Sequence, residues 1–356
     1  MKRLFLLIAT AMMVALGAQA QRIVVVDEDG VGIPLVSVLN DDGVLLGTTN
    51  LDGVLADIKG AARLTLTHVS YQPLQVSVSD LQNGRVTMQD LDYGLQEIVV
   101  SPKPYIYIET YYRMYVFLND SLCFYQAGIM PNAYNIEKKK VDSFSQTNCS
   151  GDFCPKFGAS IVWGARAMEF EAGVVHKSAV SYFKPGNGGA NKYYITMTEE
   201  PDGRRRLSNP EGTLGYIDDD DDLTRFTVDG AKAQMYADKV DGRNKLLQHR
   251  QERNYQYQFT DIFRHDEDGN CNIEDFVMYS HHWEYDDKKG HRKVIIETYA
   301  TDRGYMDKSE WKARKKELKR EYVSPMTIEQ LETYATTHHI PALSPVIRSA
   351  IEAMKH

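Results

Sequence analysis

The sequence predicts a mainly β protein, with an N-terminal β-sandwich, a larger antiparallel β-sheet domain and helices at the C-terminal end. Asp29-Gly30, Asp42-Gly43 and Asp52-Gly53 separate short apolar runs. Asp-Gly favours tight hairpins because glycine adopts positive φ freely, and turns about every ten residues are typical of a sandwich. The chain also contains 22 Tyr and 12 Phe, and these residue types are enriched in strands. Helical patterns are evident only near the end of the chain.

Length and composition indicate a globular protein. The chain has 356 residues, of which 43% are hydrophobic and 25% charged, which is enough to form two domains with buried cores. The net charge of −8 gives no reason to expect a nucleic-acid partner.

The N-terminus has the pattern of a cleavable secretory signal. Lys2-Arg3 is followed by an apolar core at 4–16 and by the small-residue site Ala18-Gln19-Ala20. The apolar core is too short to span a bilayer, and no later run is long enough. We therefore expect an exported protein without a transmembrane segment, located in the periplasm or at the cell surface.

Residues 25–78 resemble the carboxypeptidase-regulatory-like domain of bacterial cell-envelope proteins. The matching parts are Asp29-Gly30 before Ile33-Pro34, the strand 36–39, the segment 47–53, and Leu64-Thr65-Leu66 leading to Ser70-Tyr71, where Ser70 replaces the usual Gly. The resemblance implies a seven-stranded transthyretin-like sandwich. It also implies an accessory role, because this domain is fused to transporters, peptidases and envelope proteins and has no catalytic residues of its own.

Composition shifts divide the chain into five parts. They are the signal peptide 1–20, the sandwich 21–92, a linker 93–104, an antiparallel β-rich domain 105–321 and C-terminal helices 322–356. Pro102 and Pro104 keep the linker extended. The segment 95–100 also resembles the extended segment that follows this module in TonB-dependent receptors, and the alternative is a last edge strand with a linker.

The segment 105–125 is rich in aromatic residues, and Asn119-Asp120-Ser121 predicts a hairpin turn within it. Exposed aromatics on a sheet can stack on sugars or hold an apolar ligand. The candidate ligand-facing residues are Tyr105, Tyr107, Tyr112, Tyr115 and Phe124. The alternative is that these rings fill a half-buried antiparallel sheet.

Two further segments could have specific chemistry. Cys149 and Cys154 could form a disulfide in an oxidising compartment, with free thiols or a metal site as alternatives. The five aspartates 218–222 could chelate calcium. A run of like charges is also typical of a solvated hairpin tip.

The second half of the chain predicts a meander followed by helices. Strands are expected at 255–264, 273–285 and 291–299. A capping-box pattern at Asp307 and Glu310 begins a helix at 308–322 that has seven basic residues and a buried stripe of Trp311, Leu318 and Tyr322. Such a helix is either solvated or in contact with an anionic membrane surface. Thr327 with Gln330, and Ser344-Pro345, begin two further helices.

The sequence contains no recognisable catalytic signature. His249 with Glu252, and His281 with Glu284, have metal-ligand spacing, but the chain after His281 is too short for the third ligand of a zinc carboxypeptidase. There is no Gly-x-Ser-x-Gly elbow and no phosphate loop. We therefore expect no cofactor and no metal.

The expected function is that of a non-enzymatic, exported cell-envelope protein that acts in binding or assembly. Its partner would be another envelope protein, a glycan or a lipid. One alternative is a lipid or lipoprotein carrier built on a half-barrel sheet. Another is a glycan-active hydrolase, which needs a pair of carboxylates that sequence spacing does not reveal.

Overall fold

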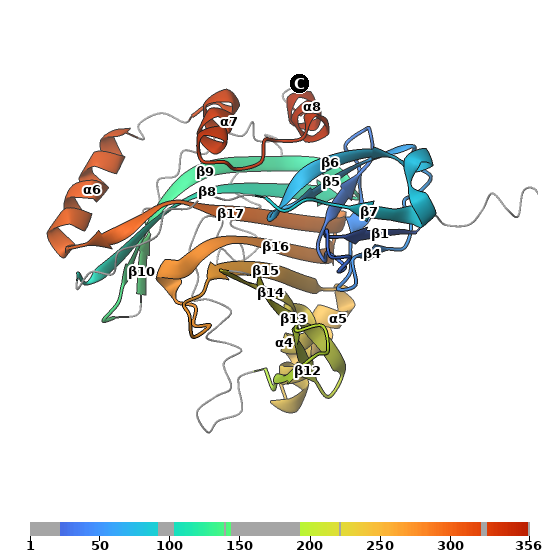
Figure 1. The fold of residues 1–356 in the computed structure, drawn as a ribbon, viewed down its shortest axis with the longest axis horizontal. Coiled ribbons are helices and arrows are strands. Elements are labelled where there is room, and N and C mark those ends of the chain that lie inside the picture. The colour runs from blue at the N-terminus through green and yellow to red at the C-terminus, as the bar shows by residue number, and fades with distance from the viewer. Residues whose placement is uncertain are drawn as a thin grey trace, which may run out of the picture.

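The computed structural model describes residues 22–91, 103–138, 140–143, 193–220, 222–321 and 326–354. These residues form a mainly β protein with two small sheets, one large antiparallel sheet and C-terminal helices (Figure 1). The expected signal peptide, most of the linker and the Cys149–Cys154 pair lie outside the described residues.

Seven strands form the N-terminal sandwich. They are β1 Ile23–Val26, β2 Ser37–Leu39, β3 Leu45–Thr48, β4 Val54–Leu55, β5 Arg63–His68, β6 Tyr71–Ser77 and β7 Arg85–Thr87. One sheet has the order β4-β1-β7 and the other β3-β2-β5-β6. All pairs are antiparallel except β1 with β7, which are parallel. The short 3-10 helices Val78–Asp80 and Gln82–Gly84 precede β7.

Asparagine side chains stabilise two of the Asp-Gly turns. The Asn50 Oδ1 atom accepts hydrogen bonds from the backbone N–H groups of Asp52 and Val54. The Asn40 Oδ1 atom accepts from Asp42 and Val44 in the same way. These turns were predicted from the Asp-Gly pairs. The side chain that accepts the hydrogen bonds of the turn, however, belongs to the asparagine two residues before the aspartate.

The large sheet has ten antiparallel strands. They are β8 Tyr105–Leu118, β9 Ser121–Asn135, β10 Lys140–Ser143, β11 Thr196–Glu199, β12 Arg205–Asn209, β13 Gly212–Asp220, β14 Leu223–Asp229, β15 Gln256–Arg264, β16 Phe276–Asp287 and β17 Gly290–Met306. The strand order is β10-β9-β8-β17-β16-β15-β14-β13-β12-β11. The last strand therefore returns to pair with the first along its length. The predicted hairpin at 119–121 and the predicted meander are both present.

Two helices between β14 and β15 were not expected from the sequence. They are α4 Gly230–Val240 and α5 Asn244–Glu252. The Asp229 carboxylate caps α4 by accepting from the backbone N–H of Lys232 at 2.8 Å. The buried face of α4 is formed mainly by alanines. Such small side chains give only a weak apolar periodicity in the sequence.

The C-terminal helices begin at the predicted caps. They are α6 Lys308–Glu321, α7 Ile328–Thr337 and α8 Pro345–Ala353. Thr327 and Gln330 form a reciprocal capping box, and the Ser344 hydroxyl accepts from Ile347 N. No helix among the described residues is long and apolar enough to cross a membrane.

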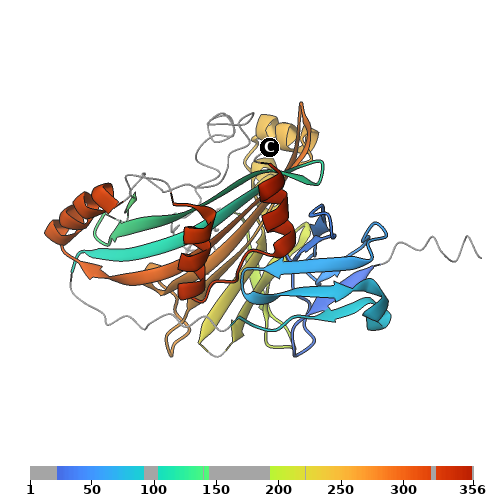
Figure 2. The same cartoon turned by 90° about the horizontal axis from the view of Figure 1, so that it is seen from above.

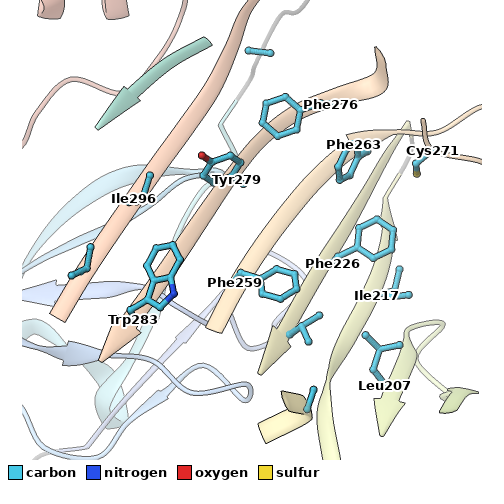
Figure 3. Packing of buried hydrophobic residues seen from close by; sticks show 14 of the residues in the cluster. Leu207, Ile217, Phe226, Phe259, Phe263, Cys271, Phe276, Tyr279, Trp283 and Ile296 are labelled. Atoms are coloured by element: carbon cyan, nitrogen blue, oxygen red, sulfur yellow. The ribbon is translucent and has the colours of Figure 1, made fainter. Parts of the chain in front are cut away.

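A different apolar cluster lies on each face of the large sheet. Helices α7 and α8 and the sandwich lie against one face (Figure 2), where Leu39 and Val69 share an apolar cluster with Tyr111, Tyr299 and Leu331. On the opposite face a second cluster runs across the strands and includes Phe226, Phe259, Phe263, Phe276 and Trp283 (Figure 3). Leu39, Leu45 and Val69 of the sandwich therefore pack in the apolar cluster of the large sheet. The sandwich also has a separate core of its own, which includes Val25, Val36 and Leu66.

Candidate functional site: a polar pocket at the junction

A small pocket lies where the sandwich, the large sheet and the α7–α8 connection meet. Its lining residues are Ser37, Leu39, Thr67, His68, Pro73, Arg113, Tyr115, Phe117, Ile295, Glu297, Tyr299, Pro341, Ala342, Leu343, Ser344 and Ile347. The space amounts to about 40 Å³, and one water molecule needs at least roughly 10–15 Å³ measured in this way. The pocket can therefore hold a few waters or one small polar group.

The alternation of side chains along two neighbouring strands places the sheet residues of the pocket. Tyr115 on β8 lies opposite Ile295 on β17, and Arg113 lies opposite Glu297. Because side chains alternate between faces, these residues point toward the sandwich and α8. Arg113 and Glu297 are 2% and 8% exposed.

Arg113 is fixed by hydrogen bonds to three groups. It donates from Nε to the Tyr111 hydroxyl at 3.1 Å, from Nη1 to the Pro341 carbonyl at 2.7 Å and from Nη2 to Glu332 Oε1 at 2.9 Å. Glu332 also accepts from the Leu343 backbone N–H at 2.8 Å. This ion pair is buried on both sides and joins β8 to the segment between α7 and α8.

Glu297 is a buried carboxyl with one described hydrogen-bond donor. The Tyr115 hydroxyl donates to its Oε2 atom at 3.1 Å. Burial raises the pKa of Glu297, and the nearby charge of Arg113 opposes that shift in part. Glu332, in contrast, is already engaged by Arg113 and Leu343, so Glu297 is the carboxyl that the pocket presents to a bound group.

His68 brings the sandwich into the site, and its hydrogen bonds define its tautomer. The backbone N–H of Ser70 lies 3.2 Å from Nδ1 and can only donate, so Nδ1 accepts and the proton is on Nε2. Nε2 is buried and has no hydrogen-bond partner among the described residues. Burial lowers the pKa of His68 well below its usual value, and the charges of Arg225 and His282 lower it further.

His282 on β16 lies next to the wall of the pocket. It pairs across the sheet with Ile295, a lining residue. Its Nε2 lies 2.9 Å from the Ser280 hydroxyl, whereas Nδ1 is buried without a partner in the described part of the chain. Burial lowers its pKa to about 3, with smaller contributions from His281 and Lys293. Two buried, uncharged histidines from separate sheets thus lie near each other at this junction.

A second polar network lies on the opposite face of the sheet. His281 Nε2 is 2.8 Å from Asp261 Oδ1, and its Nδ1 is 3.3 Å from the Tyr257 hydroxyl. The rings of Tyr279 and Trp283 surround this imidazole, and both are labelled in Figure 3. His281 and Asp261 are buried. The network therefore holds the imidazole in place within an aromatic core.

The two histidine–glutamate pairs with metal-ligand spacing do not form a metal site. His281 and Glu284 lie an odd number of positions apart on strand β16, so their side chains point to opposite faces. His249 and Glu252 are exposed on α5. No group of three or more potential ligands that could hold a metal ion occurs among the described residues.

Three residues of the aspartate run, Asp218, Asp219 and Asp220, lie at the end of β13 and pair with β14. Asp219 accepts from Arg205 Nη2 at 2.7 Å and from the Thr224 hydroxyl at 2.8 Å. Asp218 lies 3.9 Å from Arg204. The two arginines neutralise part of the negative charge of the run. Asp221 lies outside the described residues.

The five candidate aromatics do not gather around one site. Tyr115 lines the junction pocket, and Phe124 lies in the cluster on the opposite face. Tyr105 and Tyr107 pack with Trp311 of α6. Tyr112 is 1% exposed, and its hydroxyl accepts from Gln126.

Sequence reasoning missed Arg113, Glu297 and His68 as site residues. One signal was available: Arg113 is a charged residue in the middle of a long apolar and aromatic strand, and such a residue must be paired when it is buried. Nothing in the sequence places His68 opposite β8, because that contact depends on how the sandwich docks.

A scan against protein-family models finds no matching family, and a search of curated proteins finds no match.

Proposed function

We propose that the chain is an exported cell-envelope protein that acts by binding or assembly, and that its sandwich and large sheet serve together as one rigid platform. Export is proposed on the signal-peptide pattern at 1–20, and the envelope setting on the resemblance of residues 25–78 to the regulatory-like domain. The observation that carries the proposal is the junction, where the two parts share both an apolar cluster and a buried polar pocket.

Two further contacts support a rigid platform. At the β8–β9 turn, the Leu45 backbone N–H donates to the Asp120 carbonyl at 2.9 Å, and Lys59 pairs with the Asp120 carboxylate at 2.6 Å. At β14, the Arg225 guanidinium lies 5.4 Å from the centre of the Tyr71 ring. A module attached at several separate points keeps a fixed orientation, which is what a binding scaffold requires.

The chemistry of the pocket favours binding over reaction. Among the described residues, Tyr115 is the hydrogen-bond partner of Glu297, while Glu332 is held by Arg113 and by the Leu343 N–H. Hydrolysis of a glycoside uses two carboxyl groups that flank the bond, and this pocket offers one. The Glu297 carboxyl can hydrogen-bond a small polar group.

The test combines a turnover assay with a cross-linking experiment. The purified chain should show no turnover of peptides, glycans or lipid esters. A photoreactive residue at exposed Gln72 on the sandwich should give a discrete partner adduct in the cell envelope, and a matched probe at Gln248 on α5 serves as the control. Turnover that survives purification and disappears in Glu297→Gln, while the fold is unchanged, would show that the protein is an enzyme.

A lipid or lipoprotein carrier is the second candidate. It is favoured by the breadth of the antiparallel sheet, whose face opposite α7 and α8 buries mainly apolar and aromatic side chains (Figure 3). The junction pocket, at about 40 Å³, is far below the volume of a typical ligand site, roughly 300–1,000 Å³. Native mass spectrometry of detergent-free protein decides between the two, because a bound lipid adds a defined mass that the platform proposal does not predict.

A further inference from the structure

The described contacts attach helix α6 to the body of the protein along one side. Its Trp311 is 3% exposed and packs on Tyr107, with 6.2 Å between ring centroids. Lys103 Nζ lies 2.9 Å from Glu310 Oε1, and Arg314 lies 3.6 Å from Glu109. In both overall views the helix lies at the end of the large sheet away from the sandwich (Figures 1 and 2).

The other side of α6 is a stripe of lysines. Lys308, Lys312 and Lys316 are all exposed, and their spacing of four residues places them on one face, about 6 Å apart along the axis. None of the three forms an ion pair with a described residue. The carboxylates of Glu310 and Glu317 are engaged elsewhere, by Lys103 and Arg314.

This arrangement is unfavourable for the helix in isolation. Like charges four residues apart repel each other on a helix surface, and a cation in the first turn, such as Lys308, opposes the helix dipole. An anionic surface placed against the stripe would offset both the repulsion between the lysines and the unfavourable interaction of Lys308 with the helix dipole. The stripe therefore fits a negatively charged partner, on a protein whose overall charge is −8.

We propose that this outer face of α6, defined by Lys308, Lys312 and Lys316, docks the protein on an anionic lipid membrane through the headgroups. Lysines near a membrane surface are attracted to anionic lipids without a specific geometry. Recognition of phosphorylated or acidic motifs typically uses arginine clusters with bidentate geometry, whereas the stripe consists of lysines in the part of α6 whose side chains the structure describes. Binding of single-stranded nucleic acid uses exposed aromatic platforms, whereas Trp311 is turned inward.

The docking is electrostatic and does not involve insertion. Trp311, the aromatic residue in the described part of α6, is not free to enter a bilayer. It packs with Tyr105, Tyr107, Ala133 and Met306 of the same chain. An interfacial amphipathic helix would instead present its apolar face to the lipid. Binding should therefore weaken as salt screens the charges, and tryptophan emission should stay unchanged on binding.

Co-sedimentation of the full chain with lipid vesicles tests this inference. Phosphatidylcholine vesicles that contain phosphatidylglycerol should bind the protein at low salt, and pure phosphatidylcholine vesicles should not. The triple variant Lys308→Gln, Lys312→Gln, Lys316→Gln should bind roughly 100-fold more weakly, at the usual attraction per lysine. A matched variant with the same loss of charge, Lys239→Gln, Lys245→Gln, Lys288→Gln, should bind like the wild type.

The inference is overturned if the α6 variant binds as well as the wild type, or if the matched variant loses as much affinity. It is also overturned if binding resists high salt and shifts the tryptophan emission, since that indicates insertion. Tighter binding of a single-stranded DNA oligomer through the same lysines would identify a nucleic-acid surface instead.

Discussion

At the scale of single residues, two buried histidines determine how the junction responds to pH. His68 and His282 each have a ring nitrogen without a described partner, and each is held uncharged by burial. Arg225 on β14 and Lys293 on β17 add positive charge that disfavours protonation further. Glu297 has the opposite tendency, because its raised pKa favours proton uptake in the folded state.

We expect the two buried histidines to make the folded protein less stable in acid. Their folded pKa values lie below the ordinary 6.5, so below pH 6.5 the unfolded chain binds protons that the folded chain does not. The free energy of unfolding should therefore fall between pH 7.5 and pH 5, and the folded pKa of about 3 for His282 makes the share of that residue about 2 kcal/mol. Urea unfolding at the two pH values measures this difference.

The variant His68→Gln, His282→Gln should lose most of that pH dependence. His249→Gln, at an exposed position on α5, serves as the matched control and should keep the full dependence. Equal pH dependence in the double variant and the wild type would show that these imidazoles are not the cause.

Breaking the buried Arg113–Glu332 ion pair should lower the stability of the fold. Glu332→Gln keeps the shape of the side chain but leaves the Arg113 charge unpaired in a buried site, which should cost roughly 3 kcal/mol. Glu317→Gln removes an exposed pair with Arg314 and should cost less than about 1 kcal/mol. Urea unfolding of both variants checks the contrast, and similar costs would contradict it.

At the scale of elements, local signals account for what the sequence could predict. The β8–β9 hairpin was predicted from Asn119-Asp120, whose φ values of 49° and 68° suit Asn and Asp. The starts of α7 and α8 were predicted from side chains that cap the nearest backbone groups. The α4 helix was missed because its alanine-rich face gives little periodicity. The β17–β8 pairing joins distant segments, so no local pattern could reveal it.

At the Asp52-Gly53 turn, the addition of one methyl group should strongly lower the free energy of unfolding. Gly53 has φ +73°, and an added Cβ would lie 2.3 Å from the Val25 carbonyl oxygen. Gly60 has a similar φ of +71° but open space around it. Gly53→Ala should therefore cost roughly 3 kcal/mol or more, and Gly60→Ala about 1 kcal/mol for the backbone strain alone. Thermal unfolding of the pair measures the difference, and equal costs would show that close backbone approach is unimportant there.

At the scale of the whole molecule, the division at residue 92 separates two sets of strands, and the sandwich has a core of its own, but the two parts also pack against each other. The strands of the sandwich pair only with one another in the described residues, and this is the feature that sequence patterns could predict. Leu39, Leu45 and Val69 nevertheless belong to the apolar cluster of the large sheet and its helices. Docking of this kind depends on the shape of two finished surfaces, so the junction pocket and its residues could not be found from the sequence.

Native-state hydrogen exchange of the full chain tests the central claim, that the sandwich and the large sheet form one platform. The amides of Val38 and Leu66 in the sandwich should open with the same free energy and the same denaturant dependence as those of Ile295 and Tyr299 in the sheet, because residues of one cooperative unit exchange together. The contrary result is a sandwich that exchanges in a separate step at lower denaturant while protection of the sheet is unchanged. That result would mean that the two parts are independent domains joined only by the chain.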